Sequence, residues 1–227
     1  MKSRPALEVR YIPTEGRIDL TPELLLPSGK IKLLSYKDYE QFIWDDFRAF
    51  CHFNARYGIP TKELITHLNS VINGRKAIEI GAGSGDLGHY LNILMTDSKI
   101  QSDPVINLHY QLANQPTIKY PEDVLKLEAC EAVETLRPQV VIGSWLTTWA
   151  PVPSTFGSNP FGVKEWDILR QVETYILIGN KDIHGDKPLL QFPHEEFYSP
   201  FIVSRAKNQC NNRIYIWNFA DIKKRAA

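Results

Sequence analysis

The fold of this chain is decided by the stretch Glu79-Ile80-Gly81-Ala82-Gly83-Ser84-Gly85-Asp86-Leu87-Gly88. A short apolar run ends at Ile80, and leucines at helical spacing begin at Leu87. Glycines are needed where a strand turns sharply into a helix, because they accept positive φ and let a ligand approach the backbone. The stretch therefore predicts a ligand-binding turn between a buried strand and a helix.

Two glycine motifs overlap in this turn. Gly83, Gly85 and Gly88 have the G-x-G-x-x-G spacing of dinucleotide-binding proteins. Glu79 distinguishes the alternatives, because its carboxylate lies where a dinucleotide would place an anionic pyrophosphate. S-adenosylmethionine instead carries a sulfonium and an α-ammonium group, and a carboxylate in a desolvated site attracts both. Glu79 therefore favours the sulfonium cofactor over a nicotinamide dinucleotide.

Residues 79–85 resemble the first motif of the class I, Rossmann-like S-adenosylmethionine-dependent methyltransferases. In that family the acidic residue and the glycines surround the methionine part of the cofactor. The resemblance implies cofactor-binding roles for Glu79, Gly81, Ala82, Gly83 and Gly85. It also implies that S-adenosylmethionine is the cofactor.

The same resemblance implies further contacts to the cofactor. The family places an acidic residue after its second strand, where two oxygens bind the ribose hydroxyls, and Asp97 stands there. Asp103 is the alternative, but Asp103-Pro104 is also a typical helix start. Glu128 and Ala129 match the residues that line the adenine, although Glu128 equally fits a helix cap.

The acceptor side is less defined. Ser144 and Trp145 follow the fourth predicted strand, where the family approaches both the methyl group and the acceptor, so the resemblance implies that both line the pocket and bind the cofactor. Trp145 equally fits a core residue. Amino-methylating members carry Asn or Asp, two prolines and an aromatic at that place, which disfavours DNA adenine or glutamine methylation. Asn159-Pro160-Phe161 lies too far downstream to restore that motif. Ser144 and His184 are the candidate catalytic residues, with His184 as a general base or a solvated bystander.

The long segment from Ser144 to Lys164 predicts an acceptor-side loop. Its aromatic residues would stack on a planar substrate or pack the loop itself. They are Trp145, Trp149, Phe156 and Phe161.

Short apolar runs alternate with helical stretches after Gly74, which predicts a βαβ sheet with helices on both faces. The helices begin near Asp86, Asp103, Ala129 and Val163. The strands are Ala77 to Ile80, Ile93 to Thr96, Val124 to Leu127, Val140 to Gly143 and Tyr175 to Gly179. Phe201 to Ser204 and Arg213 to Trp217 predict a terminal antiparallel hairpin. The expected fold is α/β, a Rossmann-like, seven-stranded, mostly parallel sheet with that hairpin.

Residues 75–227 are therefore predicted to form the S-adenosylmethionine-binding domain, and residues 1–74 a helical or irregular extension that serves as a lid or acceptor-side element. The extension begins with alternating apolar residues at Leu7, Val9 and Tyr11. Apolar spacing predicts an amphipathic helix from Asp38 to Tyr57 and a second helix from a Thr61 cap to Asn73-Gly74. Tyr36, Tyr39 and Trp44 either cover the cofactor or pack the first helix.

Composition limits the class of protein. Lys plus Arg and Asp plus Glu both number 26, so no global charge recruits nucleic acid or a membrane. Three cysteines without a Cys-x-x-Cys pair predict a reducing interior and no zinc site. The chain also lacks the ~20 consecutive apolar residues of a membrane span. We expect a cytoplasmic protein with no metal and no membrane partner.

Three functions fit these observations. The first is a methyltransferase acting on a small molecule or a protein side chain. The second is an S-adenosylmethionine-binding module without catalysis, since no acceptor motif is recognisable. The third is an NAD(P)-binding oxidoreductase, which would use the overlapping glycine motif.

Overall fold

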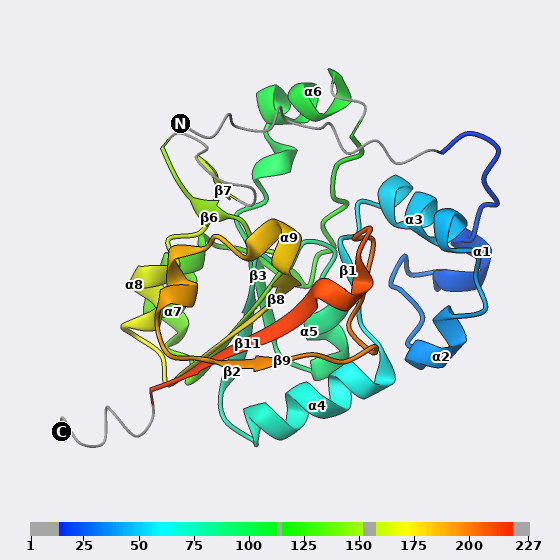
Figure 1. The fold of residues 1–227 in the computed structure, drawn as a ribbon. Coiled ribbons are helices and arrows are strands. Elements are labelled where there is room, and N and C mark those ends of the chain that lie inside the picture. The colour runs from blue at the N-terminus through cyan, green and yellow to red at the C-terminus, as the bar shows by residue number, and fades with distance from the viewer. Residues whose placement is uncertain (1–13, 113–114, 152–157, 220–227) are drawn as a thin grey trace, which may run out of the picture.

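The computed structural model describes residues 14–112, 115–151 and 158–219, in which helices cover both faces of a central sheet (Figure 1). The seven strands of this sheet lie in the order β4-β3-β2-β5-β8-β11-β9. Neighbours from β4 to β8 are parallel, and β11 is antiparallel to both β8 and β9. The expected α/β fold, a Rossmann-like and mostly parallel sheet with a terminal antiparallel pair, is confirmed.

The strands of this sheet are β2 (Ala77–Ile80), β3 (Leu94–Asp97), β4 (Val124–Lys126), β5 (Val140–Ser144), β8 (Thr174–Asn180), β9 (Glu195–Phe197) and β11 (Asn212–Asn218). The five parallel strands each lie within a residue of their predicted positions at both ends. They could be predicted because strands covered on both faces are short and continuously apolar.

Two apolar clusters cover the two faces of the sheet. Alternate residues of β5 illustrate this, because Val141 faces one cluster whereas Val140 and Ile142 face the other. The first cluster is completed by α7 (Ala129–Leu136) and α8 (Glu165–Leu169), and the second by α4 (Lys62–Ile72) and α5 (Asp86–Leu91). The sheet is thereby fixed between helices, and its carboxyl edge carries the loops that form the site.

The amino-terminal part has its own apolar cluster, built from α1 (Thr21–Leu24), α2 (Tyr36–Tyr39) and α3 (Trp44–Phe53). A two-stranded ladder joins it to the rest of the chain, since β1 (Gly58–Ile59) pairs with β10 (Val203–Ser204). Residues 1–13, including Leu7, Val9 and Tyr11, lie outside the described residues.

The predicted helix from Asp38 to Tyr57 is wrong, because two helices occupy this region. A capping box between Ser35 and Asp38 starts α2, and the chain leaves helical geometry before α3 begins at Trp44. Tyr39 of α2 and Phe47 of α3 nevertheless pack edge to face, with ring centroids 5.7 Å apart. Apolar spacing therefore continues across the break and conceals it.

The predicted partners of the terminal hairpin also need correction. β11 pairs with β9 and β8, whereas Val203 and Ser204 pair with β1. Side-chain hydrogen bonds among Ser204, Gln209 and Asn212 hold the polar run in a compact 3₁₀ turn, Gln209–Asn211. These hydrogen bonds stabilise the polar run as a turn between two strands that do not pair with each other.

The remaining short elements complete the carboxyl edge and its surroundings. They are α6 (Pro104–Leu112), α9 (Lys181–His184), β6 (Thr148–Trp149), β7 (Ser158–Asn159) and 3₁₀ turns at Ile100–Ser102 and Pro188–Gln191. Within the described ranges, no helix has the length and apolar character that crossing a bilayer requires.

Candidate functional site

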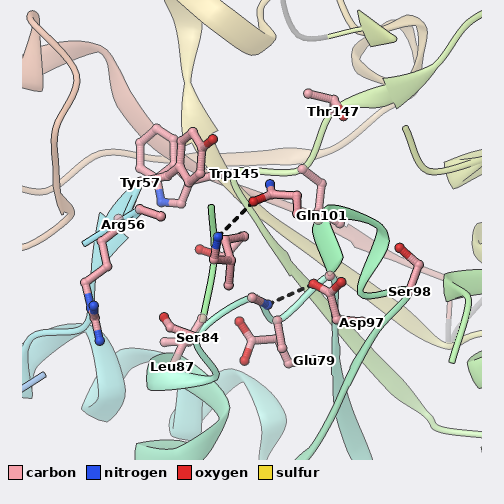
Figure 2. Close-up of a pocket in the computed structure, with 18 of the residues that line it drawn as sticks. Arg56, Tyr57, Glu79, Ser84, Leu87, Asp97, Ser98, Gln101, Trp145 and Thr147 are labelled. Carbon is pink, nitrogen blue, oxygen red and sulfur yellow. Dashed lines mark hydrogen bonds between the residues drawn. The ribbon is translucent and has the colours of Figure 1, made fainter. Parts of the chain in front are cut away.

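A cavity of about 650 Å³ lies at the carboxyl ends of β2, β3 and β5 (Figure 2). Its volume lies within the ~300–1,000 Å³ range typical of small-molecule sites. Open α/β sheets bind ligands at this edge, where the strand order reverses. The reversal here falls between β2 and β5, so the cavity occupies the place that the topology predicts.

The glycine-rich turn forms the floor of the cavity. Gly81, Gly83 and Gly85 have φ values of +57°, +57° and +65°, a region that residues with a Cβ rarely adopt. A Cβ at Gly81 would also collide with the side chain of Leu146. Gly81 and Gly83, with Ala82 between them, line the cavity, whereas Gly85 precedes the first turn of α5 and is not among the lining residues.

Glu79 lies beneath this turn and lines the cavity, although its side chain is only 2% exposed. Its Oε2 accepts a hydrogen bond from the Gly88 N–H at 2.8 Å. Burial raises the pKa of Glu79 to about 8, and the neighbouring carboxylates of Asp86 and Asp97 act in the same direction. No lysine or arginine nitrogen among the described residues lies within 4 Å of this carboxylate. The site therefore holds a buried acid without a countercharge in contact.

Asp97 stands at the end of β3 and also lines the cavity. Its Oδ2 accepts from the Gly83 N–H at 2.9 Å, which Figure 2 shows, and its Oδ1 accepts from the Lys99 N–H at 2.7 Å. Tyr120 adds a side-chain hydrogen bond, while burial raises the pKa of Asp97. A carboxylate offers about four acceptor positions, so roughly one is left for a ligand.

Asp103 has the alternative role of a helix cap. Its Oδ1 accepts from the backbone N–H groups of Val105 and Ile106, at 2.9 and 3.2 Å. It is absent from the lining of the cavity. Of the two acidic residues considered for the ribose, only Asp97 lines the cavity.

The far wall beyond Asp97 is formed by Glu128, Ala129, Gln101, Ile118 and Tyr120. Glu128 occupies the N-cap position of α7, but its side chain makes no capping hydrogen bond. Gln101 is fixed by accepting from the Ile118 N–H at 2.9 Å, the second contact drawn in Figure 2. The wall therefore presents a carboxylate beside flat and apolar side chains.

Ser144 and Trp145 line the cavity where β5 ends. Trp145 has φ +60°, an unusual backbone conformation for a bulky residue. Its indole lies against the backbone of Gly58, where a Cβ would overlap the ring. Such strain persists only where the surroundings hold it in place, and it is concentrated at functional sites.

His184 lies outside this cavity, which corrects its expected position in a polar loop. It ends the short helix α9, is 2% exposed and accepts from the Asn180 N–H through Nδ1 at 3.0 Å. Burial lowers its pKa to about 3, and its ring packs edge to face on Trp145 at 5.8 Å. His184 therefore supports Trp145 and does not meet a ligand in the cavity.

The amino-terminal part contributes residues that the sequence did not single out. Ala55 to Pro60 line the cavity, including Arg56 and Tyr57. Arg56 forms a buried ion pair with Asp86 at 2.9 Å and donates to the Gly29 carbonyl at 2.7 Å. Asp86 also accepts from the Ile31 N–H at 2.9 Å. This network joins the amino-terminal extension to the glycine turn, and no local sequence motif predicts it.

The three aromatic residues considered as a lid over the cofactor instead pack against the amino-terminal helices. Tyr36, Tyr39 and Trp44 belong to the amino-terminal apolar cluster and do not line the cavity.

The acceptor-side loop is brought back to the cavity by short pairings. Thr148 and Trp149 pair with Ser158 and Asn159, and Asn159, Pro160 and Phe161 line the cavity. Their distance along the chain from Ser144 therefore does not keep them from the site. Trp149 is exposed beside Lys164 and lies outside the lining. Phe156 lies outside the described residues.

Metal ligands were not expected from the sequence. In residues 14–112, 115–151 and 158–219, no group of three or more His, Cys, Asp or Glu side chains is arranged to hold an ion.

Comparisons with known proteins give distant similarities. No family model matches the chain, and no curated protein matches it. A hypothetical protein from Thermus thermophilus is 14% identical, with a TM-score of 0.38 over 69% of this chain and 83% of that chain. A protein assigned as a methyltransferase and complexed with SAH is 11% identical, with a TM-score of 0.33 over 66% of this chain and 48% of that one.

A third match is the Pyrococcus abyssi tRNA (uracil-54, C5)-methyltransferase in complex with S-adenosyl-L-homocysteine. It is 10% identical, with a TM-score of 0.31 over 68% of this chain and 36% of that chain. This chain thus spans about half or less of the two methyltransferase structures. Because all three TM-scores are below 0.5, the functional proposal rests on the side chains of this chain alone.

Proposed function

We propose that this chain binds S-adenosylmethionine above its glycine-rich turn and transfers the methyl group to a small molecule or a protein side chain. The observation that carries the proposal is Glu79, a buried carboxylate on the cavity wall that no cation of the described residues contacts. A buried acid of this kind is stabilised by a ligand that brings positive charge.

A dinucleotide fits this turn less well. Its pyrophosphate would lie near Glu79 and Asp97, two acidic groups that line the cavity at the turn without a contacting cation among the described residues. Gly88 has a structural reason to be glycine, because a Cβ there would lie 2.8 Å from the Glu79 Oε2. The glycine spacing is thus accounted for without a pyrophosphate.

The rest of the cofactor follows from the remaining side chains. Asp97 has about one acceptor position free, so we assign it one ribose hydroxyl and assign the other to the neighbouring Ser98, which also lines the cavity. Glu128 and Ala129 then border the adenine, with Glu128 accepting from its exocyclic amine. Arg56 lines the cavity as well and would bind the carboxylate of the methionine part.

When bound, the cofactor would supply a methyl group on a positively charged sulfur, with S-adenosylhomocysteine as the by-product. The proton that the acceptor loses would pass to water. The protein has to hold and align the acceptor and needs no general base. Ser144 and Trp145 are the side chains placed to do so, since both lie at the end of β5 and line the cavity.

Two assays test this proposal. In thermal unfolding, S-adenosylhomocysteine should raise the melting temperature and NADH should leave it unchanged, because only a ligand of the folded state stabilises it. Incubation with S-adenosylmethionine and an acceptor pool should then produce a mass gain of one methyl group together with S-adenosylhomocysteine. Stabilisation by NADH alone would reject the proposal. Stabilisation by S-adenosylhomocysteine without turnover would favour the binding module.

A further inference from the structure

The end of the cavity that lies opposite Glu79 and Asp97 has a different composition. Figure 2 shows Tyr57, Trp145 and Thr147 on that side, away from the two carboxylates. We call it the acceptor end and define it as Tyr57, Gly58, Ile59, Trp145, Thr147, Asn159, Phe161 and Val203. It includes no side chain that is charged at neutral pH.

We propose that the acceptor is an uncharged planar ring whose edge presents a hydrogen-bond donor beside a hydrogen-bond acceptor, as a carboxamide does. This inference rests on the proposed function, since it names the substrate class of the same cavity.

Three aromatic side chains provide surfaces for a ring. Tyr57 is held at the cavity by the Arg205 guanidinium, which lies 3.9 Å from its ring centroid. Trp145 is held between Gly58 and His184. Phe161 also lines the cavity and is 56% exposed, which leaves apolar surface that a ligand would cover. The rings of Tyr57 and Trp145 are held in place, and aromatic rings favour flat partners because stacking is strongest in offset and edge-to-face arrangements.

Thr147 and Asn159 provide the polar contacts. The Asn159 Nδ2 donates to the Thr147 Oγ1 at 3.1 Å, and the Asn159 Oδ1 accepts from the Phe161 N–H at 2.9 Å. The Thr147 hydroxyl keeps a proton to donate, and the Asn159 Oδ1 keeps a second lone pair. One donor and one acceptor therefore lie side by side, and an edge with the opposite pair of groups satisfies both.

An uncharged ring is favoured over a charged one because none of the side chains that define the acceptor end is charged. The Arg205 guanidinium lies on the Tyr57 ring and does not line the cavity. The neighbouring Arg56 is already paired with Asp86. Burying an unpaired charge costs far more free energy than burying a ring whose polar edge is hydrogen-bonded. The acidic side chains of the opposite end would additionally disfavour an anion.

Three probes separate shape from charge. Benzamide is planar and uncharged, cyclohexanecarboxamide has the same amide on a puckered ring, and benzoate is planar and charged. Ligand-observed NMR titrations with protein saturated with S-adenosylhomocysteine should give benzamide an affinity at least about fivefold higher than that of either control probe. Equal affinities, a preference for benzoate, or no benzamide binding at millimolar concentration would overturn the inference.

Two variants test whether benzamide binds at the acceptor end. Phe161→Leu and Thr147→Val should each lower the benzamide affinity about threefold or more, with S-adenosylhomocysteine affinity unchanged. Phe53→Leu is the matched control, because Phe53 is 60% exposed on α3 and lies outside the cavity lining. If S-adenosylhomocysteine does not bind at all, the proposed function fails, and titration of the probes into the free protein still tests the ring site.

Discussion

The two ends of the cavity are built from different kinds of interaction. Around the glycine turn, buried charges are fixed by hydrogen bonds and an ion pair, as in Glu79, Asp97 and the Arg56–Asp86 pair. At the acceptor end, the side chains are uncharged, include three aromatic rings and are drawn from segments far apart in the chain. This difference underlies both proposals, a charged ligand at the first end and a partner selected by shape at the second.

The largest effect on stability is expected for the Arg56–Asp86 ion pair, which joins the amino-terminal extension to the glycine turn. Asp86→Asn leaves the Arg56 guanidinium buried without its countercharge, so unfolding free energy should fall by about 3–5 kcal/mol. The matched control is Asp45→Asn, which removes a more exposed pair with Arg17 and should cost less than about 1 kcal/mol. Urea denaturation measures both. Similar losses in the two variants would mean that the buried pair does not hold the two parts together.

The next effect concerns the stability contributed by Glu79. Burial raises its pKa from about 4.5 to about 8, so folding favours the neutral acid. Stability from this group is complete below pH 4.5 and is lost as the pH rises toward 8. In the absence of ligand, Glu79→Gln should therefore be more stable than the wild type at pH 8, by roughly 4 kcal/mol.

That difference should disappear near pH 4.5, as thermal unfolding across this pH range would show. A variant that is less stable at pH 8 would indicate that the carboxylate is already compensated in the free protein.

A smaller effect on stability is expected from alanine substitutions in the glycine turn and at Gly74, which together distinguish backbone strain from side-chain crowding. Gly81 and Gly74 both have positive φ, but only a Cβ at Gly81 meets another side chain, that of Leu146. Gly74→Ala should cost about 1 kcal/mol from strain alone, and Gly81→Ala about 1–3 kcal/mol more. Denaturant titrations give both values. Equal costs would show that Leu146 can move away without loss.

The smallest effect on cofactor affinity is expected from a substitution at the acceptor end. Gly58→Ala adds a Cβ where the indole of Trp145 lies, so the ring has to move. The tryptophan emission spectrum should change, whereas S-adenosylhomocysteine affinity should change less than about threefold because no charged contact is altered. Trp145→Phe in the same background should remove the spectral change. A large loss of cofactor affinity would mean that the two ends are not independent.

The sequence predicted the glycine turn, the five parallel strands and the Thr61 and Asp103 caps, because each depends on residues that are close together in the chain. The Thr61 hydroxyl accepts from the Leu64 N–H at 3.1 Å, three residues away. Signals of this kind are short-range and physically specific. The site roles of Glu79 and Asp97 stay predictions, although both line the cavity.

The missed features depend on distant contacts. Arg56 and Tyr57 reach the cavity through the β1 and β10 pairing, and Asn159 through the β6 and β7 pairing. Strands of two residues carry no periodicity, so neither pairing can be predicted from local sequence. His184 was misplaced for a related reason: a lone histidine gives no sign of being buried behind Trp145.

The central claim is that Glu79 meets positive charge on the ligand, and proton release tests it most directly. Calorimetric titration of S-adenosylmethionine without acceptor at about pH 7, in buffers with different ionisation enthalpies, should show release of roughly one proton, because binding ionises an acid whose pKa is about 8. Glu79→Gln should release none and bind at least about tenfold more weakly. Wild-type binding without proton release, together with an unchanged Kd for Glu79→Gln, would contradict the account.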